Sequence, residues 1–187
     1  MHEPGALFVS EGLQVESMAG IESGLLTLVP HEASWADLAM AELDRIQEAC
    51  PARIVERAHI GATSVEGLLA RPVLDLLIGV QEMMHSGETI QPLKGIGYRC
   101  HGEQGVPGRR FFSLSRESRG LVHVHLYRVG SPLWESALTF RDRLRSDAAL
   151  ARSYDELRSG LFEADPGDLA GYEQAKRSFQ EEAVGLT

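Results

Sequence analysis

Cysteine, positive charge and long apolar runs are all scarce in this sequence of 187 residues. Two cysteines, Cys50 and Cys100, cannot build a disulfide scaffold, and we expect a reducing, cytoplasmic location. The 18 lysines and arginines are outnumbered by 27 acids, and the net charge of −9 argues against nonspecific nucleic-acid binding. No apolar run approaches the roughly 18 residues of a membrane span, and no basic, apolar leader opens the chain. We therefore expect neither a membrane segment nor a signal peptide.

The composition that is present fits an ordinary folded domain. Hydrophobic residues make up 43% of the chain and charged residues 24%. A chain of this length can bury roughly two thirds of its unfolded surface, so it needs no disulfides or bound metals for stability. We expect residues 25–187 to form one domain and residues 1–24 to be an N-terminal extension.

Hydrophobic periodicity and turn residues predict strands and helices in mixed order, followed by a helical tail. Strands are expected over residues 25–29, 53–60, 73–80, 110–116 and 121–128, the last two as a hairpin. Helices are expected over residues 35–50, 64–69, 81–93, 133–145, 148–162 and 169–184, with caps at Ser34, Ser64, Ser131, Asp147 and Asp168. This order predicts an α+β fold, a small mixed sheet flanked by helices with a helical C-terminal part.

A glycine turn, Gly61-Ala62-Thr63-Ser64, joins two of the expected strands. Backbone N–H groups in such a turn can bind a phosphate, and the hydroxyls of Thr63 and Ser64 could add donors. The next strand carries Asp75, whose carboxylate is a suitable Mg²⁺ ligand. Turn and carboxylate together could hold a metal-bound nucleotide. An ordinary strand–turn–helix with a capping serine is the alternative interpretation.

The run His59-Ile60-Gly61-Ala62-Thr63-Ser64, followed by Arg71-Pro72-Val73-Leu74-Asp75, resembles the signature of the GrpB family. The resemblance covers residues 25–182 and continues through Arg110-Phe111-Phe112, His123-Val124-His125-Leu126, Phe140-Arg141-Asp142 and Lys176. It implies a nucleotidyltransferase-type fold, similar to the polymerase beta-like nucleotidyltransferases. Three residues depart from the usual signature, in which serine stands at Ala62, proline at Glu66 and lysine at Arg71.

The carboxylates that two-metal nucleotidyl transfer uses are incomplete in this chain. Polymerase beta-like enzymes carry two acids at alternate positions of one strand, but the alternate neighbour of Asp75 is Leu77. The strand expected to supply a third acid carries His123 and His125 instead, and these alternate, so they share one face. Imidazoles suit Zn²⁺ or Mn²⁺ better than Mg²⁺, and His59 is a further candidate ligand.

Several cations are candidates for binding phosphate, which a guanidinium or an ammonium group recognises through charge-assisted hydrogen bonds. Arg110 precedes the expected hairpin, Arg141 lies on the helix after it, and Lys176 lies on the last helix. Each of them fits a solvated surface charge equally well.

Three functions follow from these residues. The first is binding of a nucleotide or another small phosphorylated ligand, with nucleotidyl transfer as a candidate activity and Asp75, His123 and His125 as catalytic residues. The second is a catalytically silent binding module on the same fold. The third is a metal-binding protein or hydrolase that uses His59, Asp75, His123 and His125 to hold Mg²⁺, Mn²⁺ or Zn²⁺.

Overall fold

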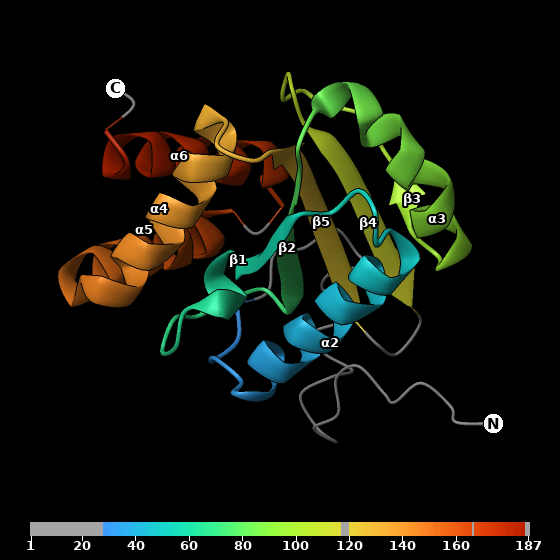
Figure 1. Cartoon of the computed structure of the whole chain (residues 1–187). Helices are drawn as coiled ribbons and strands as arrows, with labels where there is room; N and C mark the ends of the chain where they lie inside the picture. Colours follow the sequence, from blue (N-terminus) through green and yellow to red (C-terminus); the bar gives the residue numbers. More distant parts are fainter. Residues whose placement is uncertain (1–27, 117–119, 166, 186–187) are drawn as a thin grey trace.

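A five-stranded mixed sheet forms the centre of the molecule, with the strand order β1-β2-β5-β4-β3 (Figure 1). The computed structural model describes residues 28–116, 120–165 and 167–185. Its strands are β1 (Glu56–Ile60), β2 (Val73–Val80), β3 (Arg99–Cys100), β4 (Arg110–Arg116) and β5 (Gly120–Arg128). Strands β2 and β5 are parallel, and all other neighbours are antiparallel. The predicted α+β class is therefore confirmed.

One face of the sheet is covered by α2 (Ser34–Ala49), the 3₁₀ helix η2 (Met83–Thr89) and α3 (Ile90–Gly95) (Figure 1). Apolar residues recur along α2 at helical spacing, and Trp35, Leu43 and Ile46 are almost fully buried against the sheet. Strand β2 contributes Leu74, Leu76 and Ile78 to this main core. Its nearly unbroken aliphatic sequence reflects burial on both faces.

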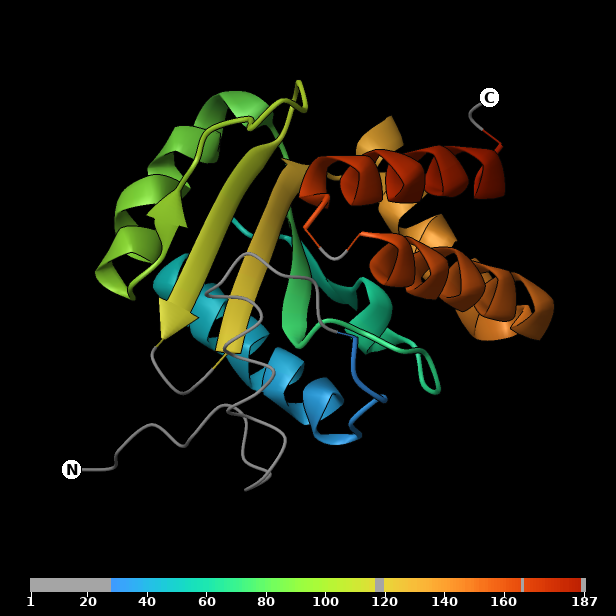
Figure 2. The same cartoon turned by 180° about the vertical axis from the view of Figure 1, so that it is seen from behind.

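The C-terminal helices α4 (Pro132–Ser146), α5 (Ala148–Ala164) and α6 (Leu169–Ala183) gather beside β1, on the other side of the sheet. Figure 2 shows β4 and most of β5 without a described helix in front of them on this side. Trp134 of α4 packs here against Leu77 and Tyr127 in a second, smaller core. The helices thus cover only the β1 side of this face, and the polar residues of β5 lie beside them.

Several predicted elements are confirmed and others are wrong. The hairpin, the three C-terminal helices and the caps Ser131, Asp147 and Asp168 are present. Ser34 begins α2 but does not cap it, because the N-cap is Ala33. Residues 64–69 form no helix beyond the short 3₁₀ turn η1 (Ala62–Ser64), because Ala70 bridges back to Val29.

The remaining expectations are met only in part. The expected helix 81–93 begins as the 3₁₀ helix η2 and becomes α-helical only in α3. The expected boundary at residue 24 and most of the first expected strand lie outside the described residues. Among the helices that the structure describes, none is long and apolar enough to span a bilayer.

Gly79 allows α4 to pack closely on the sheet. A Cβ at Gly79 would lie 2.4 Å from Cγ2 of Val129 and 2.9 Å from Cζ3 of Trp134. We expect Gly79→Ala to lower the free energy of unfolding by about 1–3 kcal/mol, the usual effect of overpacking. Gly160→Ala is the matched control, since Gly160 is exposed in α5 with no atom near its missing Cβ. It should raise stability by about 0.5–1 kcal/mol. Urea unfolding of both variants measures the contrast, and equal effects would contradict it.

Candidate functional site

The carboxylate of Asp75 lies directly against the backbone of Gly61. Gly61 follows β1 with φ 72° and ψ −178°, a conformation that essentially only glycine adopts. A Cβ at this position would lie 2.5 Å from Oδ2 of Asp75. Asp75 stands opposite Ile60, the last residue of β1, in the β1–β2 pairing. The turn and the carboxylate are therefore fitted to each other.

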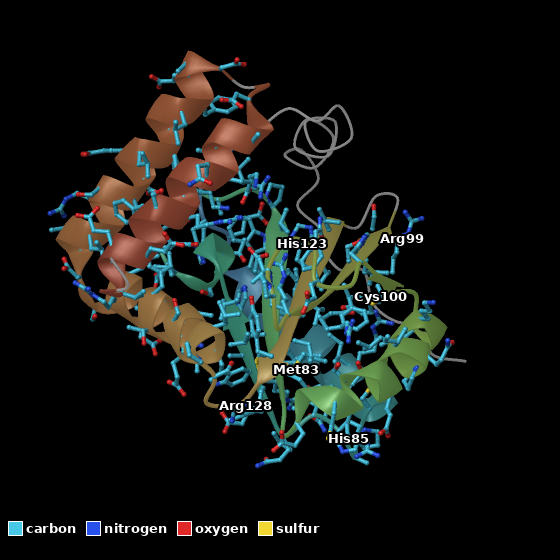
Figure 3. All side chains as sticks on the ribbon, turned by 90° about the horizontal axis from the view of Figure 1, so that it is seen from above. Met83, His85, Arg99, Cys100, His123 and Arg128 are labelled. Atoms are coloured by element: carbon cyan, nitrogen blue, oxygen red, sulfur yellow. The ribbon has the colours of Figure 1, made fainter. Side chains whose placement is uncertain are left out.

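Two histidines of β5 contact the same carboxylate. Oδ1 of Asp75 lies 3.4 Å from Nε2 of His125 and 3.5 Å from Nδ1 of His123. The parallel register pairs Asp75 with His123, so the three side chains share one face. Figure 3 shows His123 on the side of the sheet away from Met83 and His85 of η2. The alternation read from the sequence thus brings both histidines to Asp75.

Burial and the histidines act on Asp75 in opposite directions. Burial alone would raise the pKa of Asp75, but the hydrogen bonds and charge of His123 and His125 outweigh it and hold the pKa well below its usual range. Burial also lowers the pKa of His125, which Asp75 only partly offsets. At neutral pH the pair is therefore an ionised carboxylate that accepts a hydrogen bond from Nε2–H of a neutral imidazole.

The hydroxyls of the glycine turn are used within the protein. Thr63 Oγ1 donates to the carbonyl of Val73 at 3.1 Å, so it accepts from Nε2–H of His59 at 2.9 Å. Ser64 Oγ donates to the carbonyl of Gly61 at 2.7 Å. These two hydroxyls brace the turn and leave its backbone as the surface that faces a pocket.

A pocket of about 420 Å³, including solvent at its mouth, opens beside Asp75. Its walls come from the glycine turn, from the start of β2 and from helices α5 and α6. The lining residues are Gly61, Ala62, Thr63, Arg71, Val73, Asp75, Tyr154, Arg158, Tyr172, Lys176 and Gln180. Three of these side chains are cationic and one is anionic, so the pocket has the opposite charge balance from the whole chain.

The three cations are held in place by neighbouring acids. Arg71 lies 3.2 Å from Oε1 of Glu173, and Lys176 lies 3.2 Å from Oε2 of the same residue. Arg158 is 2% exposed and pairs with Asp155 of its own helix. Burial lowers the pKa of Lys176, and the nearby charge of Arg71 adds to that effect, while Glu173 opposes it.

The structure brings some of the expected phosphate-binding residues to the pocket and not others. Gly61, Ala62, Thr63 and Lys176 line it, whereas Ser64 lies behind the turn. Arg110 points to the other face of the sheet, where its side chain donates to Oγ of Ser86 at 3.3 Å.

Arg141 does not line the pocket either. It donates to the carbonyl of His59 at 3.3 Å and pairs with Asp142. The side chain of Arg141 therefore links α4 to the end of β1.

Sequence reasoning missed Arg158, Tyr172 and Gln180 as lining residues, and it noted Arg71 only as a departure from a motif. Arg158 and Tyr172 lie far beyond Arg71 in the sequence, on α5 and α6, and reach the pocket only through helix docking. Arg71 stands two residues before the buried strand β2. That position beside Asp75 was the one feature of the sequence that could have indicated a cation in the pocket.

Of the four expected metal ligands, His123 and His125 lie against Asp75, but His59 does not join them. Within residues 28–116, 120–165 and 167–185, no three His, Cys, Asp or Glu side chains could hold a metal ion. His59 pairs with Leu76, so it lies on the opposite face of the strands from Asp75, and it bonds to Thr63. The donor set does not fit a metal, and we derive no chemical step through one.

Comparison with known proteins shows to which family the chain belongs. The family model described as GrpB protein matches residues 25–185. The chain belongs to the GrpB family. It is 31% identical over 183 residues to UPF0157 protein YqkA of Bacillus subtilis (strain 168), covering 91% of this chain and 53% of that protein. It therefore spans about half the length of that relative.

Two further relatives match over most of their own length. UPF0157 protein SCO7215 of Streptomyces coelicolor is 34% identical over 162 residues, which cover 87% of this chain and 84% of that protein. The crystal structure of conserved protein GrpB from Enterococcus faecalis superposes with a TM-score of 0.75 at 27% identity. That match covers 86% of this chain and 98% of the solved chain, so the two share their fold.

In this GrpB chain, Gly61 should be far less tolerant of a side chain than another glycine with positive φ. Gly67 has φ 84° and no atom within 4 Å of the place that a Cβ would take, so Gly67→Ala meets backbone strain of about 1–2 kcal/mol and no collision. We expect Gly61→Ala to lower the free energy of unfolding by at least ~3 kcal/mol, because strain and the collision with Asp75 add. Chemical denaturation of both variants tests this. Equal losses would show that Asp75 does not press on the turn.

Stability of this GrpB chain should fall in mild acid because His59 is buried in its neutral form. Burial lowers the pKa of His59 to about 4 from an unfolded value near 6.5. Between these values the unfolded chain binds a proton that the folded chain does not, so stability falls as pH falls through this window. The loss at pH 4 is on the order of 3 kcal/mol. Asp75, whose pKa is lowered, adds a further loss below about pH 4, its unfolded value.

Unfolding measured from pH 7 to pH 4 checks the role of His59. His59→Gln keeps a donor for Thr63 and should flatten the slope, although His125, whose pKa is also lowered, retains part of it. A slope in His59→Gln equal to that of the unchanged protein would contradict this assignment.

Proposed function

We propose that this GrpB chain binds the phosphate groups of a nucleotide or another small phosphorylated ligand in the pocket beside Asp75. One observation carries the proposal: Arg71 from the segment before β2, Arg158 of α5 and Lys176 of α6 line the same pocket. The chain as a whole has a net charge of −9, so a cationic pocket is a local feature that selects an anion.

The state of Arg158 supports an anionic ligand. Its guanidinium is almost fully buried, yet Nε has no hydrogen-bond partner among the described residues. A buried donor without an acceptor is unfavourable, and buried polar groups are normally satisfied. A phosphate oxygen reaching Arg158 would supply the missing acceptor. Arg71 and Lys176 share one carboxylate, that of Glu173, so each keeps further donors for a ligand.

Asp75 sets the orientation of such a ligand. Its ionised carboxylate repels phosphate, so the phosphate groups belong on the side of the three cations. Asp75 lines the pocket and His125 does not, and Nε2–H of His125 donates to Asp75. His125 therefore positions the Asp75 carboxylate, which is the base that faces a ligand in the pocket.

Nucleotidyl transfer is the second candidate function, and the position of Asp75 between the pocket and His125 favours it. In that reaction an acceptor hydroxyl would bond to the α-phosphorus, the bond to the β-phosphate oxygen would break, and pyrophosphate would leave. The Asp75 carboxylate, which lines the pocket and accepts from His125, would take the proton of the hydroxyl. Incubation with radiolabelled nucleotides and analysis of labelled products tests this step. Product that forms in the unchanged protein and disappears in Asp75→Asn supports it, whereas nucleotide binding without product supports the silent binding module.

Binding itself is tested with the two lysines of the chain. A ligand that binds only the folded state raises the melting temperature, so ATP should do so. We expect Lys176→Gln to weaken binding by roughly 10- to 150-fold, the usual range for one charge-assisted hydrogen bond. Lys94→Gln is the matched control, since Lys94 is exposed on α3 and does not line the pocket. Thermal shift and calorimetry at low and high salt measure both variants. No shift with any nucleotide, or equal weakening by both substitutions, would contradict the proposal.

A further inference from the structure

The aromatic rings of the pocket are already covered by protein groups. Tyr172 is 2% exposed, and two cations lie over its ring, with Arg71 Cζ at 5.6 Å and Lys176 Nζ at 5.3 Å from the centroid. A flat base needs an open ring face on which to stack, and Tyr172 does not offer one. Its contribution is to position the two cations.

Tyr154 is covered in the same way. It is 3% exposed, and Cζ of Arg158 lies 4.3 Å from its ring centroid. Phe140 and Phe179 pack against the same ring, with centroids 5.2 Å away in both cases. Tyr154 is therefore part of the core between α4, α5 and α6, and only its edge can reach the pocket.

The aromatic group beyond Asp75 is also occupied. Phe111 of β4 is 8% exposed, and the rings of His123 and His125 lie 5.1 and 5.2 Å from its centroid. The guanidinium of Arg109 lies over it at 4.9 Å. Among the described residues, the tyrosines that line the pocket and Phe111 on the strands beside it are therefore all less than 9% exposed.

We propose, on the basis of the function proposed above, that the pocket recognises its ligand by the phosphate groups and not by a base. What faces the pocket is three cations, the backbone of the glycine turn, the Asp75 carboxylate and the amide of Gln180. Cations are the most numerous of the polar side chains here, so charge-assisted hydrogen bonds to phosphate oxygens are the main contacts that the pocket offers. The ligand class is therefore a short polyphosphate chain, with or without a nucleoside attached.

This selectivity has a measurable consequence. A base stacked on an aromatic side chain strengthens binding by roughly 5- to 150-fold, and a site without such stacking lacks that gain. Inorganic tripolyphosphate should then bind within about tenfold of any nucleoside triphosphate, and the four triphosphates within about threefold of one another. Adenosine, which has no phosphate, should not bind.

Isothermal titration calorimetry of the full chain with tripolyphosphate, ATP, GTP, CTP, UTP and adenosine, at one salt concentration, tests the proposal. Lys176→Gln should weaken tripolyphosphate and ATP by the same factor, and Lys94→Gln should weaken neither. Loss in both variants would show diffuse attraction of a polyanion to the surface and would overturn the proposal.

The outcomes separate this proposal from the function on which it rests. If one nucleoside triphosphate binds more than about tenfold tighter than tripolyphosphate or than the other three, base contacts exist and the phosphate-only proposal fails, while phosphate binding stands. If neither tripolyphosphate nor any nucleotide binds, the proposed function fails as well.

Discussion

The close approach of the Asp75 carboxylate to the backbone of Gly61 is the constraint on which the rest of the site depends. It works only because Gly61 lacks a side chain and adopts φ 72°. One carboxylate oxygen lies against the turn, and the other contacts His123 and His125 on the neighbouring strand. The end of β1, the start of β2 and the middle of β5 are thus joined at one point, and the pocket opens beside it.

The basic pocket of an acidic chain depends on docking of the C-terminal helices. Arg158 of α5 bonds to the carbonyl of Leu69, and the backbone N–H of Leu69 donates to Asp155 of the same helix at 3.2 Å. These paired contacts fix α5 against the segment before β2, and α6 follows with Lys176. The pocket therefore assembles only when the helical part docks against this segment. A ligand that bridges the turn and these helices should stabilise both.

Local chemistry in the sequence was enough to predict the sheet, the hairpin and the capped C-terminal helices. Strand alternation also placed His123 and His125 on one face, because the side-chain period of a strand is 2. The same rule sends Arg110 to the opposite face, since it pairs with Leu126 and not with His125, but the register that decides this is a long-range property. The pocket residue Arg158 could not be found because it reaches the pocket through helix packing, which no short motif encodes.

In the sequence, the turn and Asp75 look like part of a catalytic signature. In the part of the chain that the structure describes, the Asp75 carboxylate contacts the turn and two histidines, without the second carboxylate that two-metal transfer uses. The carboxylate is engaged by two histidines, and the three cations that line the pocket beside it support our proposal that the ligand is a phosphate. A crystal structure of the chain soaked with tripolyphosphate tests this central claim most directly. We expect phosphate density in contact with Arg71, Arg158 and Lys176 beside the glycine turn. Density elsewhere on the molecule, or an unchanged pocket at saturating ligand, would contradict it.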